Sequence, residues 1–120
     1  MAKFATNAMI DGGLDKVATC VNITVCSGQP ISFADIATKK LATTTLVGGD
    51  FTKANGTISG RKVTVGAKSS VSITATGSAD HVVIDDNVSE YEVTTCTAQG
   101  LTVGGTVTIP AWAIEIADPV

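Results

Sequence analysis

The chain has 120 residues, of which 16% are charged and 4% aromatic, and its net charge is −3. This length suits one domain, with a core of aliphatic side chains rather than large rings. An acidic chain without clustered basic residues is not expected to bind nucleic acid through its phosphates, and no stretch is apolar for long enough to span a membrane. The mean hydropathy of +0.34 predicts that some apolar surface is covered by a partner or by other copies of the chain.

The N-terminal part of the chain predicts a weak helix. It covers residues 5–17, where one face is expected to carry Ala8, Met9, Leu14 and Val17. The pair Gly12-Gly13 weakens this helix by about 1 kcal/mol per glycine. We therefore expect residues 1–20 to form an arm or short helix and residues 21–120 to form a β body. No apolar stretch of signal-peptide length is found here, so synthesis in the cytoplasm is expected.

The middle of the chain mixes strand, turn and helix signals. Alternating or Thr-rich residues predict strands at 21–25 and 41–47. Gly, Pro and Asn residues predict turns at 27–30 and at Asn55-Gly56. Between them, Ser32 is placed to cap a single helical turn within residues 31–40.

From Arg61 onward, apolar and polar side chains alternate with a period of two. Val63 and Val65, for example, alternate with Lys62 and Thr64. This alternation predicts antiparallel strands at 62–67, 70–76, 81–84, 91–97, 101–103, 106–110 and 111–116. Gly104-Gly105 is expected to join 101–103 to 106–110 as a two-residue hairpin. The fold class predicted is mainly β: a single-domain antiparallel β-sandwich or small barrel with a short N-terminal helix or arm.

His81 is the only histidine of the chain, which leaves two interpretations of it. It could pair with Asp80, Asp85 or Asp86 as an acid/base centre. Alternatively, it begins the strand of residues 81–84 with its ring on a sheet face. The second interpretation is preferred, because a lone histidine offers no spare partner for a catalytic triad or a metal site.

The densest group of side-chain oxygens comprises Asp85, Asp86, Asn87, Glu90 and Glu92. Hard cations such as calcium bind such oxygens, but the spacing of an EF-hand is missing. A solvated acidic turn between two strands is therefore preferred to a cation site.

Three cysteines, Cys20, Cys26 and Cys96, form an odd set. They are expected to be reduced thiols, with one disulfide left open for an oxidising medium. Cys20 and Cys26 lack the CxxC spacing of a zinc site and are expected to be buried as small apolar side chains.

Trp112 and Tyr91 allow two interpretations. They could form a platform on which a sugar stacks, or Trp112 could plug the core from a closing strand, which is preferred. No nucleophile motif and no paired carboxylates at helical spacing are present, so no enzyme is expected. We assign no catalytic residue, no cofactor-binding residue and no metal ligand.

Two blocks of the sequence resemble small structural proteins of the virions of tailed bacteriophages. The first is Ser59-Gly-Arg-Lys-Val-Thr-Val65 followed by Val71-Ser-Ile-Thr-Ala-Thr-Gly-Ser-Ala-Asp-His-Val-Val-Ile84. The second is the ending Leu101-Thr-Val-Gly-Gly-Thr-Val-Thr-Ile-Pro-Ala-Trp112. The N-terminal portion, a weak helix leading to Val21-Asn-Ile-Thr-Val-Cys-Ser-Gly-Gln-Pro30, is similar to the same group. The motifs are generic strand motifs and carry no catalytic or binding residues to transfer.

This resemblance implies a capsid decoration, or cement, protein on the capsid exterior. The implied partners are the major capsid protein and further copies of the chain, as a homotrimer on a local three-fold axis. Residues 1–13 are expected to act as an arm that becomes ordered on a partner. The alternative is a tail- or fibre-associated adhesion module that binds carbohydrate.

Overall fold

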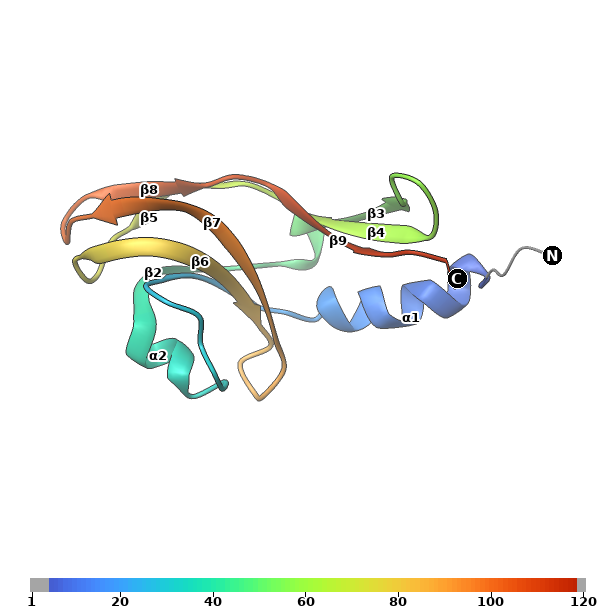
Figure 1. Ribbon diagram of the computed structural model, residues 1–120, viewed down its shortest axis with the longest axis horizontal. Coiled ribbons are helices and arrows are strands. Elements are labelled where there is room, and N and C mark those ends of the chain that lie inside the picture. The colour runs from blue at the N-terminus through green and yellow to red at the C-terminus, as the bar shows by residue number, and fades with distance from the viewer. Residues whose placement is uncertain (1–4, 119–120) are drawn as a thin grey trace.

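The computed structural model describes residues 5–118, which form a mainly β single domain with a helix near the N-terminus (Figure 1). The helical elements are α1 (Asn7–Val17), α2 (Asp35–Lys39) and the short 3-10 turn η1 (Gly48–Asp50). The strands are β1 (Asn22–Cys26), β2 (Lys40–Thr45), β3 (Phe51–Asn55), β4 (Arg61–Val65), β5 (Lys68–Ser72), β6 (Gly77–Asp85), β7 (Tyr91–Leu101), β8 (Thr106–Ile109) and β9 (Trp112–Ile116). The predicted fold class is confirmed.

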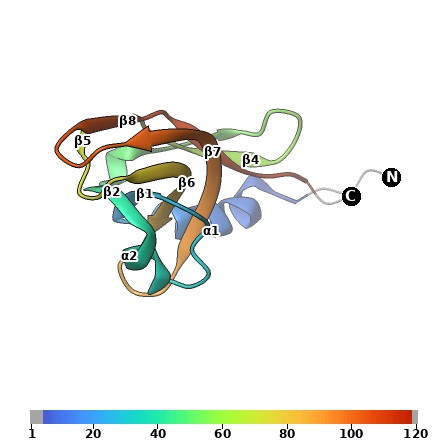
Figure 2. The same ribbon diagram turned by 60° about the vertical axis from the view of Figure 1, so that its left-hand side comes forward.

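The strands form three antiparallel sheets, with orders β2-β1-β6-β7, β3-β4-β9 and β5-β8. Figure 2 shows α2 on one side of β1 and β2, and β5 and β8 on the other. The sheet of β3, β4 and β9 continues away from this sandwich and has α1 beside it (Figure 1). The domain is elongated, at 55 × 24 × 24 Å, with a radius of gyration of 15.4 Å against about 14 Å for a compact domain of this length.

One hydrophobic core joins the three sheets. Its fully or almost fully buried members include Ile23 and Ile84 from the four-stranded sheet, Val65 from β4 and Ile109 from β8. A second, smaller cluster lies under α2 and contains Cys26, Ile36 and Val83. Successive side chains of β1 and β6 therefore point alternately toward the main core and toward α2.

Helix α1 differs from its sequence prediction in the face that it buries. Ile10 and Leu14 are buried, whereas Met9, which was predicted on the buried face, is 77% exposed. Ile10 and Leu14 are four residues apart and therefore lie on one side of the helix. Gly13 permits close packing there, because a Cβ at this position would lie 3.1 Å from Cδ1 of Ile116.

The predicted N-terminal arm, residues 1–13, is helical from Asn7 onward. Residues 1–4 lie outside the described residues. The helix is tied to the neighbouring sheet by an ion pair between Asp15 and Lys53, and by a second pair that Asp11 makes with β4. Ordering of this segment on a partner stays a prediction. Among the described residues, no helix has the length and apolar character needed to cross a bilayer.

The predicted hairpin around Gly104-Gly105 is wrong in its pairing. Strand β7 runs unbroken to Leu101 and pairs with β6, whereas β8 pairs with β5 in another sheet. The glycines do form a turn, in which Gly105 N donates to Thr102 O at 3.1 Å and Gly104 has a φ of +94°. Both glycines also exchange backbone hydrogen bonds with Ile73, and these bonds lead the chain across to β5.

Val63 and Val65 are fully buried, as predicted. The tight turn predicted at Asn55-Gly56 is instead a longer connection over residues 56–60, closed by a hydrogen bond from Gly56 N to Gly60 O at 2.9 Å. Ser32 caps the turn at residues 33–34 that leads into α2, because its Oγ accepts a hydrogen bond from Asp35 N at 3.2 Å, as predicted.

Candidate functional site

A groove of about 280 Å³ lies between α2 and the outer face of the four-stranded sheet. Its floor consists of polar side chains from β1, β2 and β6, which are Asn22, Thr24, Thr43 and Asp85. Its walls come from α2 and its approaches, and they are Phe33, Ala34, Ile36, Ala37 and Lys40. Asn87, from the loop between β6 and β7, also borders it. The groove is thus assembled from three stretches far apart in the sequence, residues 22–24, 33–43 and 85–87.

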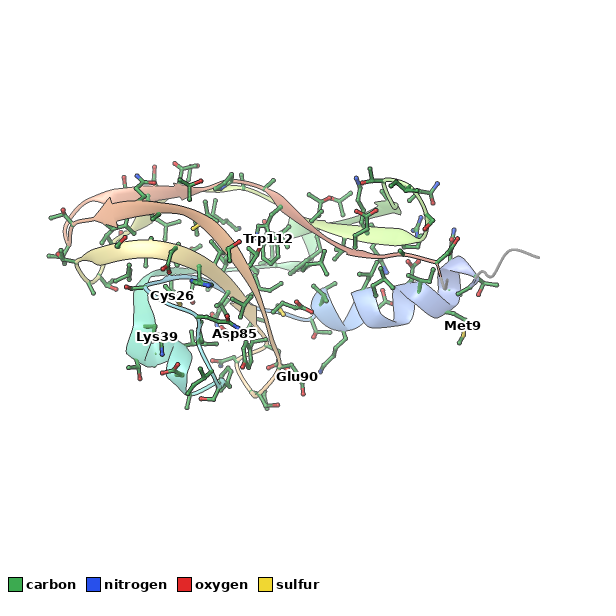
Figure 3. The ribbon with its side chains drawn as sticks, viewed as in Figure 1. Met9, Cys26, Lys39, Asp85, Glu90 and Trp112 are labelled. Carbon is green, nitrogen blue, oxygen red and sulfur yellow. The ribbon has the colours of Figure 1, made fainter. Side chains whose placement is uncertain are left out.

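The strands supply this polar floor because of their alternation. Ile23 and Val25 point into the main core, so Thr24 between them faces outward toward α2. The antiparallel register places Thr24 beside Thr43 and Asn22 beside Asp85. In the view of Figure 3, Asp85 lies between α2, which carries Lys39, and the β6–β7 loop, which carries Glu90.

Asp85 is the one buried charged side chain among the described residues, with 4% of its surface exposed. Its Oδ1 accepts hydrogen bonds from Asn22 Nδ2 at 3.0 Å and from Asn87 N at 2.9 Å. None of the hydrogen bonds among residues 5–118 reaches its Oδ2, and none of their ion pairs includes it. Oδ2 is not among the enclosed, unpartnered polar atoms, so Asp85 presents a carboxylate oxygen without a counter-charge at the edge of the groove.

The hydroxyls of Thr24 and Thr43 form a chain with a defined direction. Thr43 Oγ1 donates its hydrogen to Ile23 O at 3.1 Å. In the 2.9 Å contact between the two hydroxyls, Thr24 must therefore be the donor. Thr24 has then used its hydrogen, and its oxygen presents only acceptor capacity to a further partner.

Asp86, next to Asp85, serves the β6–β7 loop instead. Its Oδ1 accepts backbone hydrogen bonds from Val88, Ser89 and Glu90 at 2.9, 3.0 and 3.1 Å. The bond from Val88, followed by that from Ser89, lowers the pKa of Asp86 below its ordinary value of 3.8. Lys16 on α1 lies 3.6 Å away. The predicted acidic patch is therefore divided: Asp86 organises a turn, whereas Asp85 faces the groove.

The acidic patch does not converge on one point. Within residues 5–118, no group of three or more His, Cys, Asp or Glu side chains has an arrangement that could hold a metal ion. Glu90 and Glu92 are exposed at the surface.

His81 pairs with only one of the three carboxylates that the sequence offered. Its Nδ1 lies 2.7 Å from Oδ1 of Asp80, and the same oxygen accepts a bond from Gly28 N at 2.7 Å. The contact with His81 is the main cause of a lowered pKa of Asp80. Asp85 and Asp86 do not contact His81. The ring lies half-buried on the outer sheet face, as the preferred interpretation predicted.

The three cysteines are free thiols, of which Cys20 and Cys26 are buried and Cys96 is exposed on β7. Burial raises the pKa of both Cys20 and Cys26 to about 11, so these thiols stay protonated at neutral pH. The prediction that these two cysteines act as small buried apolar side chains is confirmed.

Trp112 and Tyr91 do not form a shared platform. Trp112 packs against the main core, as the preferred interpretation predicted, whereas Tyr91 packs against the smaller cluster under α2. The other aromatic residues in the described part of the chain, Phe33 and Phe51, are half-buried as well. Nε1 of Trp112 is buried and finds no hydrogen-bond partner among residues 5–118.

Several large apolar side chains are exposed, three of them on loops and one, Met9, on α1. The most exposed are Ile58 at 97%, Ile31 at 85%, Met9 at 77% and Val88 at 74%. Ile31 precedes α2 and Val88 lies in the β6–β7 loop, so the two segments that border the groove each carry one of them. Ile58 lies at the tip of the β3–β4 connection.

Sequence reasoning missed both the groove and the exposed apolar residues. A signal for the second was present, since Ile58 and Val88 each stand among Gly, Ser, Thr and Asn residues of predicted turns. No local signal identifies the groove, because Thr24 and Thr43 look like ordinary strand residues until the register pairs them.

Comparisons of this chain with protein-family models, with curated proteins and with solved structures find no match.

Proposed function

We propose that this chain is a virion structural protein of a tailed bacteriophage, a capsid decoration or cement protein that binds the major capsid shell and stabilises it. The observation that carries this proposal is a solvent-exposed isoleucine, Ile58, at the tip of a hairpin that neighbouring strands hold in place. The sequence resemblance in residues 59–84 and 101–112 supports the same assignment. The binding would use protein surface and no catalytic chemistry.

The hairpin that presents Ile58 is held in place by neighbouring strands. Glu115 on β9 accepts hydrogen bonds from Thr57 N and, at 3.2 Å, from Thr57 Oγ1. Gly60, with a φ of +72°, lies so close to β9 that a Cβ there would be 1.9 Å from Ile116 O. The tip is thus pre-organised, and its isoleucine is 97% exposed. An apolar side chain held rigidly in water suits insertion into a pocket of a partner.

The strength of each contact can be modest. Full burial of Ile58 would contribute about 1.5–3 kcal/mol. A shell offers the same site many times, and copies joined as a trimer on a local three-fold axis would bind with raised effective concentration. Weak single contacts can therefore add up to stable occupancy.

The test is to mix purified protein with phage shells stripped of accessory proteins, and to image the shells and measure their heat resistance. Regular lattice occupancy with raised heat resistance is expected. Ile58→Asp should reduce occupancy at least tenfold, whereas Val47→Asp, at another exposed apolar position, should not. Bare shells, or equal effects of the two variants, would contradict the proposal. Solution mass measurement on the same sample tests the trimer.

The N-terminal arm needs its own variant. Removing residues 1–13 would delete Ile10 and Asp11, which stabilise the fold. Removing residues 1–5 leaves α1 and its N-cap residue Thr6, whose carbonyl accepts hydrogen bonds from Met9 N and Ile10 N, and is the cleaner test. Lower shell occupancy is expected if the arm binds the shell, and unchanged occupancy would limit binding to the remaining chain.

The alternative, a tail- or fibre-associated module that binds carbohydrate, requires exposed aromatic faces. The described aromatic residues are half-buried and belong to two separate clusters. A shift of Trp112 fluorescence on adding glycans, together with protein found on tails, would replace the capsid proposal by this one.

A further inference from the structure

We propose that the groove between α2 and the four-stranded sheet is a receptor for a guanidinium group, the side chain of an arginine on a partner polypeptide. This site differs from the Ile58 tip and does not depend on the partner being a capsid shell. The inference rests on the charge of the groove, on its hydrogen-bonding capacity and on the shape and chemistry of its walls.

The charge requirement comes from Asp85. This carboxylate is 4% exposed and borders the groove, yet no ion pair among the described residues neutralises it. Its neighbour Asp86 has Lys16 at 3.6 Å, so the nearest ammonium group on α1 is engaged elsewhere. A cation entering the groove would supply the missing counter-charge to Oδ2 of Asp85.

The hydrogen-bonding capacity of the floor is almost entirely that of acceptors. Oδ2 of Asp85 has accepted nothing within the described chain, and Thr24 has used its one hydrogen on Thr43. Asn22 turns its Nδ2 toward Asp85 because a carboxylate only accepts, so the amide oxygen of Asn22 is left as a further acceptor. A ligand that carries several donors and no acceptor fits this floor.

The walls select an arginine side chain among such ligands. Phe33, Ile36, Ala34 and Ala37 are apolar, and they suit an aliphatic stem with a flat cation that can stack on the ring of Phe33. A metal ion is a poor occupant, because Asp85 is the one carboxylate that lines the groove. Lys40 is the basic residue among those that line the groove, and it is exposed and outside ion-pair distance of Asp85. It would therefore compete only weakly with a cationic ligand for the Asp85 carboxylate.

The surroundings favour an arginine within a polypeptide over the free amino acid. Ile31 and Val88, on the two segments that border the groove, are 85% and 74% exposed. A small ligand would leave both in water, whereas residues flanking an arginine in a partner chain would cover them. The groove and its two apolar neighbours thus match a basic side chain with apolar residues beside it.

The test uses N-acetyl-arginine methylamide, followed in a heteronuclear NMR titration by the signals of Asn22, Thr24 and Asn87. Saturable shifts are expected for this probe, and none for the citrulline analogue, which has the same shape without the charge. A short peptide with leucine on both sides of the arginine should bind at least fivefold more tightly than the single-residue probe. Equal affinity for the two would overturn the polypeptide assignment.

Variants separate the groove from general electrostatics. Asp85→Asn should weaken the arginine probe at least tenfold, whereas Glu90→Gln removes a nearby exposed charge and should change affinity less than twofold. Lys40→Ala should raise affinity. If Asp85→Asn does not fold, Thr24→Val removes one floor acceptor at nearly constant shape and should weaken binding about threefold. Absence of saturable shifts in the native chain, or equal losses in Asp85→Asn and Glu90→Gln, would overturn the proposal.

Discussion

Asp11 and Arg61, 50 residues apart in the chain, form an ion pair in which Arg61 Nε donates to Asp11 Oδ1 at 3.0 Å. Arg61 also donates from Nη1 to Asn55 Oδ1 at 2.9 Å. The pair connects α1 to β4, and the side chains of Asp11 and Arg61 are only 21% and 17% exposed. The helix is therefore part of the folded domain and not an appendage.

Loss of this ion pair should loosen α1. Asp11→Ala is expected to lower the free energy of unfolding by about 1–2 kcal/mol, because it leaves a partly buried guanidinium without its partner. Asp15→Ala is the matched control: its pair with Lys53 is more exposed, at 59% and 37%, and should be worth under about 1 kcal/mol. Urea unfolding of both variants measures the difference, and equal losses would contradict the anchoring role.

The two adjacent glycines of α1 should respond differently to alanine. A Cβ at Gly12 meets nothing within 4 Å, so Gly12→Ala should stabilise the chain by about 0.5–1 kcal/mol through helix propensity. At Gly13 the Cβ would lie 3.1 Å from Cδ1 of Ile116, so the same gain is offset by crowding. Thermal unfolding should rank Gly12→Ala above Gly13→Ala, and the reverse order would contradict the packing of α1 on β9.

Replacing Trp112 by phenylalanine should change the free energy of unfolding only a little, because of the indole nitrogen. Trp112→Phe removes a buried N–H that has no partner in the described part of the chain, and this relief of about 1–3 kcal/mol offsets much of the lost ring contact. We expect a change in the free energy of unfolding within about 1 kcal/mol. Trp112→Ala should cost about 3–5 kcal/mol because it opens a cavity. Similar large losses in both variants would show that the indole nitrogen does have a partner.

Acid should destabilise the chain partly through Asp86. Its pKa is lowered in the fold, chiefly by the hydrogen bond from Val88 N, so its ionised form contributes stability above its unfolded value near 3.8. That contribution is lost as the pH falls through the lower, folded pKa. Asp86→Asn should therefore flatten the fall in unfolding midpoint as the pH drops below the unfolded pKa of about 3.8. Glu90→Gln in the same loop is the control, and a slope unchanged in Asp86→Asn would contradict this role.

Local sequence patterns are enough to predict the class of the fold and the burial of alternating strand residues such as Val63 and Val65. Alternation over Arg61–Val65 correctly indicates that Val63 and Val65 are buried, because a strand turns successive side chains to opposite faces whatever its partners are. The Ser32 cap is equally local, since its hydroxyl needs only the backbone three residues ahead.

Tertiary structure alone decided which strands pair and which faces meet. The turn at Gly104-Gly105 was recognisable, but its strand β8 pairs with β5, because every strand edge offers the same backbone donors and acceptors and side-chain packing chooses among them. In the same way, Ile10 rather than Met9 is buried because β4 and β9 determine where α1 can dock. The groove depends most on tertiary structure, since only the register of three strands brings Thr24, Thr43 and Asp85 together in its floor.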